Sequence, residues 1–150
     1  MTNQKILDRL APCGLHCGKC FAFTQGSVKT HSKGLEEALG DFDAYAERFV
    51  DLLNEPGFSK YPQFKEVLSC LNQISCKGCR ADDCRLFEAC RVKSCYKEQQ
   101  VDFCFECEKF PCTQTGFDDH LYDRWEKINI RMKTIGVENY YSEIKDVNRY

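Results

Sequence analysis

The chain alternates between stretches with a helical pattern of apolar residues and a central stretch that lacks one. Between residues 35 and 53 apolar side chains recur every three or four positions, which is the spacing of one face of a helix. These positions are Leu35, Ala38, Leu39, Phe42, Tyr45, Ala46, Phe49, Leu52 and Leu53. We expect one long helix here, with Ser32 as its N-cap. Gly40 weakens it by roughly 1 kcal/mol relative to alanine, and residues 54–57 end it.

Three further helices are predicted on the same grounds. One begins near Pro62, which suits the first turn of a helix, and its inward positions are Phe64, Val67, Leu68, Leu71 and Ile74. The next ends at Gly136 as its C-cap, and its apolar positions are Leu121, Trp125, Ile128, Met132 and Ile135. A short last helix carries Val137, Tyr140, Tyr141 and Ile144. The fold class is therefore mainly α.

Residues 76–112 show no long apolar period, and their one weak strand signal lies around residues 101–103. This segment cannot build a core from its side chains alone. We expect a single domain over residues 1–150, helical over 30–75 and 116–147, with an irregular cysteine-rich segment at 76–112 that metal staples together. A domain of 150 residues does not need a metal in order to fold. The 12 cysteines of the chain therefore need an explanation of their own.

The cysteines fall into two groups. The N-terminal group is Cys13, Cys17 and Cys20. The second group is Cys76, Cys79, Cys84, Cys90, Cys95, Cys104, Cys107 and Cys112. Three pairs have CxxC spacing, which lets both sulfurs approach one ion at Zn–S distances of about 2.3 Å, and Gly18 and Gly78 ease two of these turns because glycine tolerates positive φ. We predict that these cysteines bind zinc as a structural metal.

The assignment of cysteines to ions stays open. The second group suffices for two four-thiolate sites, either divided in sequence order between Cys90 and Cys95 or interleaved, with two CxxC pairs on one ion. Cys70 is expected to be a buried core residue of its helix instead of a ligand. The N-terminal group leaves one coordination position, which His16, His31, a cysteine of the second group or water could fill.

The N-terminal spacing CxxxCxxC also holds the iron–sulfur cluster of radical S-adenosylmethionine enzymes, but this chain is too short for the barrel that they need. A closed site at this group would be structural, and an open one could be catalytic. The alternative to structural zinc is thus an enzyme or redox protein with an open metal or iron–sulfur site at Cys13, Cys17 and Cys20. No phosphate loop, dinucleotide fingerprint or catalytic triad is present, so whether the protein is an enzyme stays undecided.

Charge and hydropathy narrow the range of possible partners and the expected compartment. The net charge of -2 gives no general attraction to nucleic acid or anionic lipid. No apolar stretch reaches the ~18 residues of a membrane helix, and no secretion signal is seen, so we expect the reducing cytoplasm. A basic cluster accompanies the second cysteine group, namely Lys77, Arg80, Arg85, Arg91, Lys93 and Lys97. Its favoured role is to neutralise thiolates. Nucleic-acid binding is less favoured, because no aromatic residues interleave with these basic residues.

Finally, the motifs CGLHCGKC, CKGCR and CFECEKFPC, a helix with Trp125 and Asn129, and the closing IGVENYYSEIK together resemble a family of short cysteine-rich bacterial and archaeal proteins known as a domain of unknown function. The resemblance covers nearly the whole chain. It implies a prokaryotic, zinc-binding protein without an assigned activity, and it supplies no catalytic residues. The leading expectation is a zinc-stabilised binding or adaptor module whose partner is another protein.

Overall fold

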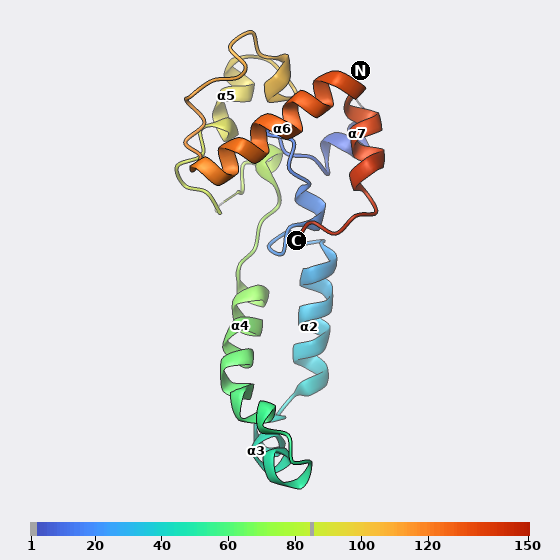
Figure 1. Ribbon diagram of the computed structural model, residues 1–150, viewed down its shortest axis with the longest axis vertical. Coiled ribbons are helices and arrows are strands. Elements are labelled where there is room, and N and C mark those ends of the chain that lie inside the picture. The colour runs from blue at the N-terminus through green and yellow to red at the C-terminus, as the bar shows by residue number, and fades with distance from the viewer. Residues whose placement is uncertain (1–2, 85) are drawn as a thin grey trace.

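A computed structural model describes residues 3–84 and 86–150 as a compact head from which a helical arm projects (Figure 1). The arm, residues 27–73, consists of α2 (Ser27–Leu39), α3 (Asp43–Leu52), the 3-10 turn η2 (Pro56–Lys60) and α4 (Tyr61–Gln73). The head holds α1 (Gln4–Leu7), α5 (Val92–Glu98), α6 (Asp119–Ile135), α7 (Val137–Ile144) and three 3-10 turns, η1 (Cys17–Lys19), η3 (Cys79–Ala81) and η4 (Cys104–Glu106).

The mainly α-helical prediction is confirmed. Within the described residues the only β interactions are isolated bridges, Leu10 with His16 and Phe23 with Cys76. The ribbon expected around residues 101–103 is therefore wrong, because this stretch passes directly into η4. The irregular segment does contain one short helix that the sequence did not predict, α5.

The long helix expected to begin after Ser32 is two helices. The first, α2, already starts at Ser27, and Ser32 lies inside it, where its hydroxyl donates to the Val28 carbonyl at 2.7 Å. The chain breaks at Gly40, whose φ of +49° is left-handed and cannot continue an α-helix. The apolar period resumes on α3, so periodicity alone did not reveal the change of direction.

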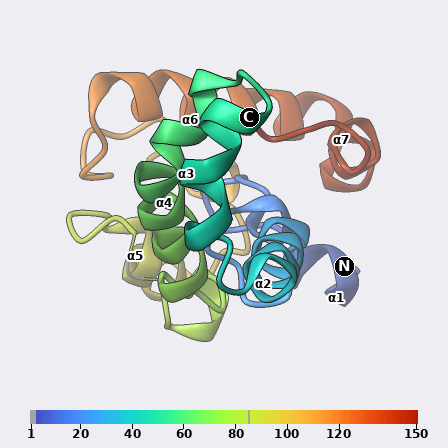
Figure 2. The same ribbon diagram turned by 90° about the horizontal axis from the view of Figure 1, so that it is seen from below.

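The arm buries few of its apolar side chains. The helices α2 and α4 run side by side, and α3 lies at the far end (Figures 1 and 2). Leu68, Ala46 and Tyr61 are buried, but large apolar residues remain exposed, namely Leu35, Tyr45, Leu52, Leu53, Phe64, Val67 and Ile74. Two helices and a tip supply too few neighbours to cover both stripes. The inward placement of several of these residues is thus wrong, and so is the core role of Cys70, which is exposed.

A buried lysine joins the two long helices of the arm near the head. The Lys29 side chain is only 2% exposed, and its Nζ donates to the carbonyls of Leu71, Asn72 and Ile74 at the end of α4. The last carbonyls of a helix lack intrahelical partners and carry partial negative charge. Lys29 therefore caps α4 from the neighbouring helix.

We expect Lys29→Met to destabilise the protein by about 2–3 kcal/mol, because three carbonyls lose a charged donor while the buried stem is largely retained. Urea unfolding followed by circular dichroism measures this loss. Lys33→Met, at an exposed position one turn along α2, is the matched control and should change little. Equal stability of the two variants would contradict the capping role.

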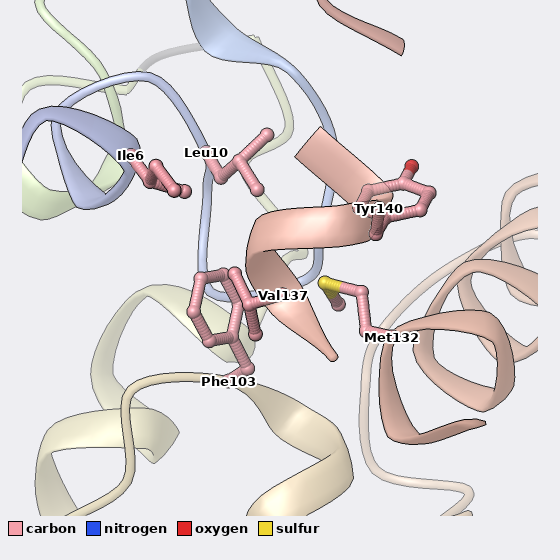
Figure 3. Close-up of a cluster of buried hydrophobic side chains, with 6 residues drawn as sticks. All are labelled: Ile6, Leu10, Phe103, Met132, Val137 and Tyr140. Carbon is pink, nitrogen blue, oxygen red and sulfur yellow. The ribbon is translucent and has the colours of Figure 1, made fainter. Parts of the chain in front are cut away.

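The core of the head packs the N-terminal segment against the last two helices. Figure 3 shows Ile6 and Leu10 together with Phe103, Met132, Val137 and Tyr140 in one buried cluster. Helix α6 ends at Gly136, with φ of +84°, as predicted. Its start, which the sequence analysis did not assign, is capped by the Asp118 carboxylate, which accepts from the Leu121 N–H at 2.8 Å. Helix α4 likewise begins with Pro62 in its first turn.

Candidate metal centre

Two cavities in the head are lined by cysteines, each with a volume of about 40 Å³. The first, called the shared cavity because both cysteine groups reach it, is lined by Cys13, Cys17, Cys20, Cys76, Cys79, Cys84 and Cys90. The second cavity is lined by Cys95, Cys104, Cys107 and Cys112. Every cysteine predicted as a ligand thus lines one of the two cavities, whereas Cys70 lies on the arm.

A tight turn of the N-terminal segment carries Cys13 into the shared cavity. The Gly14 N–H donates to the Ala11 carbonyl at 2.8 Å, and Gly14 has a φ of +87°. A Cβ at Gly14 would lie 2.3 Å from Ile128 Cγ2 on α6, so the turn has room only for glycine. Of the two glycines expected to ease CxxC turns because glycine tolerates positive φ, Gly78 has a φ of +100°, but Gly18 does not have a positive φ.

Backbone pairing brings the two cysteine groups together. The Cys76 N–H donates to the Ala22 carbonyl at 2.8 Å, and the Thr24 N–H donates to the Cys76 carbonyl at 3.0 Å. This short bridge places the turn at Cys17 and Cys20 beside the turn at Cys76 and Cys79. Cysteines of the second group are therefore the near candidates to complete the N-terminal site.

The two histidines proposed as completing ligands lie elsewhere. The His16 ring stacks on Tyr141 at 5.6 Å between centroids and lines a different cavity. Burial and the nearby cations, Lys19 foremost, lower the pKa of His16 to about 4. His31 is exposed on α2 in the arm.

Thiols in the shared cavity contact one another in a row. Cys79 lies within reach of both Cys17 and Cys84, and Cys76 lies within reach of Cys84. Hydrogen bonding from Cys79 is the largest cause that lowers the pKa of Cys84 to about 5 and the pKa of Cys17 to about 7, although its single S–H serves one of the two at a time. Burial raises the pKa of Cys76 to about 11 and that of Cys13 still further. The buried thiols thus favour their protonated forms unless a cation takes the place of the protons.

This row is not a finished coordination shell. Over residues 3–84 and 86–150, no three Cys, His, Asp or Glu side chains form a group already arranged to hold a metal ion. All twelve cysteine side chains are free thiols. To bind an ion tetrahedrally, side chains that now meet pairwise would have to turn toward a common centre.

The second cavity gathers its cysteines from three short elements. Cys95 comes from α5, Cys104 and Cys107 from the CxxC turn η4, and Cys112 from just beyond the cis Phe110–Pro111 bond. Burial, with Cys95 and Cys112 close by, raises the pKa of Cys104 to about 11. These four are the second half of the division in sequence order. The interleaved division does not match, because Cys76 and Cys79 line the other cavity.

Two side chains of α6 support both sets of cysteines. Asn129 is fully buried, and its amide donates to the Cys13 and Trp125 carbonyls, both at 2.9 Å, while its Oδ1 accepts from the Phe105 N–H at 3.1 Å. It thus holds the turn of Cys13 and the turn of Cys104 on one helix. Trp125 and Asn129 are four residues apart on one face of α6, and this spacing was the signal for both residues in the sequence.

The indole N–H of Trp125 tests whether a metal would fit here. It is buried and meets no acceptor of hydrogen-bonding geometry among the described residues, yet it lies close enough to Cys104 to oppose the rise of that thiol's pKa. A thiolate, as in a metal complex, accepts an N–H bond better than a neutral thiol. A set of soft sulfur donors with this support fits zinc, and also iron–sulfur clusters.

Charged groups around the cysteines only partly match the predicted basic cluster. Burial raises the pKa of Cys90 and Lys93 opposes that rise, while Lys93 adds to the lowering of the Cys84 pKa that Cys79 mainly causes, as neutralisation requires. Arg149, from the C-terminal end, lines the shared cavity and lowers the pKa of Cys17, a role that the sequence did not reveal. Lys97 instead pairs with Asp82 at 2.6 Å, and Arg85 lies outside the described residues.

Fold and site together define a small helical protein whose cysteine-rich head holds two thiol-lined cavities and carries a projecting arm. The chain belongs to the family of proteins of unknown function DUF3795, whose model matches residues 9–116. The match includes both cysteine groups and the arm but ends before α6, so it is shorter than the resemblance indicated. No match was found among curated proteins or solved structures. None of the described helices combines the length and the apolar character needed to cross a bilayer.

Proposed function

We propose that this protein binds zinc through the cysteines of both cavities, that the metal is structural, and that the protein acts as a binding or adaptor module. One observation carries the proposal. Every cysteine of the head lines one of two cavities, although these cysteines come from segments far apart in the sequence. Metal would then replace the core that residues 76–112 cannot form from apolar side chains.

The arm supports the adaptor role, with another protein as the partner. Its exposed apolar side chains include Tyr45, Leu52, Leu53 and Val67, each at least 55% exposed. Tyr45, Leu52 and Leu53 all lie on α3 or at its end, and contiguous exposed apolar residues are typical of protein interaction sites. Nucleic acid is less favoured, because the net charge of -2 gives no general attraction to it. The reducing cytoplasm would keep the thiols available to metal.

Metal content of two serine variants tests the proposal. Cys107→Ser removes a thiolate of the second cavity and should lower bound zinc by about one ion per chain, since three thiolates with a hydroxyl hold zinc more weakly. Cys70→Ser, at the exposed cysteine of the arm, should keep the full content. Elemental analysis of both, purified without oxygen and with reductant, gives the comparison. Equal zinc in the two variants would contradict the assignment of Cys107.

A second candidate is an enzyme or redox protein with an open metal or iron–sulfur site at Cys13, Cys17 and Cys20. It is favoured by one observation, that Cys17 lines both the shared cavity and a wide open groove. Visible absorption and brown colour after anaerobic purification would support a cluster there. Colourless protein containing zinc alone would count against it.

A further inference from the structure

A groove of about 800 Å³ lies between α1 and the turn that holds Cys76 and Cys79. Lys5 and Arg9 line it from the N-terminal segment, and Lys77 and Arg80 line it from the second cysteine group. Cys17 and Cys79 form part of its wall, and both also line the shared cavity. The groove thus joins the outer surface of the head to the cysteines.

The charge of the groove is unbalanced. Lys5, Arg9 and Lys77 are exposed, and within residues 3–84 and 86–150 none of them forms an ion pair. Among the described residues Asp8 is the one carboxylate of the lining, and it accepts from the Gln4 side chain at 2.8 Å. Four cationic side chains therefore face one carboxylate. In a concave surface such an excess raises the local concentration of anions.

Both walls are fixed by the fold. On one side Ile6 and Leu10 hold α1 and the residues after it in the head core (Figure 3). On the other side the Arg80 guanidinium donates to the Leu10 carbonyl at 3.0 Å and to the Asp102 carbonyl at 2.6 Å. Arg80 also lies over the Phe103 ring at 5.0 Å from its centroid. The groove is therefore largely formed before a ligand arrives, as small-molecule sites commonly are.

Aromatic and amide side chains complete the lining. Tyr141, which is half-buried and stacks on His16 with one face, borders the groove, as do Phe23, which is only 8% exposed, and the amides of Gln4 and Gln25. Rings offer stacking surface to a planar group, and amides offer both donors and acceptors to its edge. The volume lies within the roughly 300–1,000 Å³ of small-molecule sites.

We propose that this groove binds a small phosphate-bearing molecule with a planar ring, of the class of a nucleoside diphosphate. The phosphates lie against Lys5, Arg9 and Lys77, and the ring lies against Tyr141. This goes beyond the structural metal role, because the recognition uses cations and rings instead of thiols. It does not depend on which metal the cysteines hold.

Calorimetric titration of the full-length protein with adenosine diphosphate tests the proposal. We expect saturable binding of one molecule, and binding of uncharged adenosine at least about tenfold weaker because the phosphate contacts are lost. The double variant Lys5→Glu and Lys77→Glu should weaken diphosphate binding by at least about tenfold. The matched control is Lys60→Glu with Lys133→Glu, which makes the same change in charge at exposed residues outside the groove and should keep the affinity.

Metal content and circular dichroism of every variant separate this test from the zinc proposal, since a groove variant with unchanged metal and fold isolates the ligand site. Three results would overturn the groove proposal. They are no saturable diphosphate binding, an equal loss of diphosphate affinity in the control variant, or oligonucleotide binding without diphosphate binding. In the last case a single-stranded oligonucleotide would bind and the groove variant would abolish that binding. If the protein contains no metal but still binds the diphosphate, the zinc proposal alone is contradicted.

Discussion

Chelation of the metal from the reduced protein is expected to unfold the head. Structural zinc contributes about 10–16 kcal/mol per site in small metal-dependent peptides, which rivals the whole stability of an ordinary domain, about 5–15 kcal/mol. Without the ions, buried thiols such as Cys13 in the shared cavity and Cys104 in the second cavity, whose pKa values burial raises, take up protons and no longer hold their cavities together. The turns at residues 76–112 then lose what holds them.

Trp125 reports this transition directly. It is the single tryptophan of the chain, it is 1% exposed, and it lines the second cavity. Its fluorescence should shift to longer wavelength as chelator removes the metal, and the helical signal in circular dichroism should fall with it. Adding zinc back should restore both signals. Release of the metal with unchanged spectra and melting would show that the ion is not structural.

Replacement of Asn129 by leucine is expected to cost about 3–5 kcal/mol of folding free energy. The side chain is fully buried, and its loss leaves the Phe105 N–H and the Cys13 carbonyl without partners. A buried backbone group without a partner costs about 1–3 kcal/mol. Since leucine has a similar volume, lost packing should contribute less than the lost hydrogen bonds.

The same substitution should weaken metal binding, because Asn129 holds the turns that carry Cys13 and Cys104. Supporting residues around metal ligands commonly change affinity by about 10–100-fold. Competition with a chromogenic chelator measures this, and urea unfolding measures the stability. Ile130→Ala, at the next residue of α6 and 51% exposed, is the control and should alter neither strongly. If both variants behave alike, the proposed support of the cysteine turns is wrong.

The sequence predicted the helices that have the clearest apolar period and the clearest start or stop residues. Helices α4, α6 and α7 lie where Pro62, Gly136 and the apolar spacing indicated. The expected helix across Gly40 was wrong, because an apolar stripe can continue on a second helix after a turn. Burial in the arm was also wrong, since a stripe tells which side of a helix is apolar but not how many neighbours cover it. Cys70 was misjudged for that reason.

The candidate site was predictable in its residues but not in its grouping. CxxC spacing, together with the clustering of further cysteines around these pairs, identified the cysteines that line the two cavities. Nothing in the spacing indicated that Cys17 and Cys20 join the second group, because backbone pairing at Phe23 and Cys76 brings them together and leaves no mark in residue type. Arg149 reaches the shared cavity from the far end of the chain, a contact that only the folded structure reveals.

Metal analysis of the full-length protein, purified anaerobically with reductant and without added metal, tests the central claim most directly. We predict zinc bound at about two ions per chain or more, as expected for four-thiolate sites in two cavities, with iron and sulfide near background. Protein that is fully folded by circular dichroism and carries no metal would contradict the account.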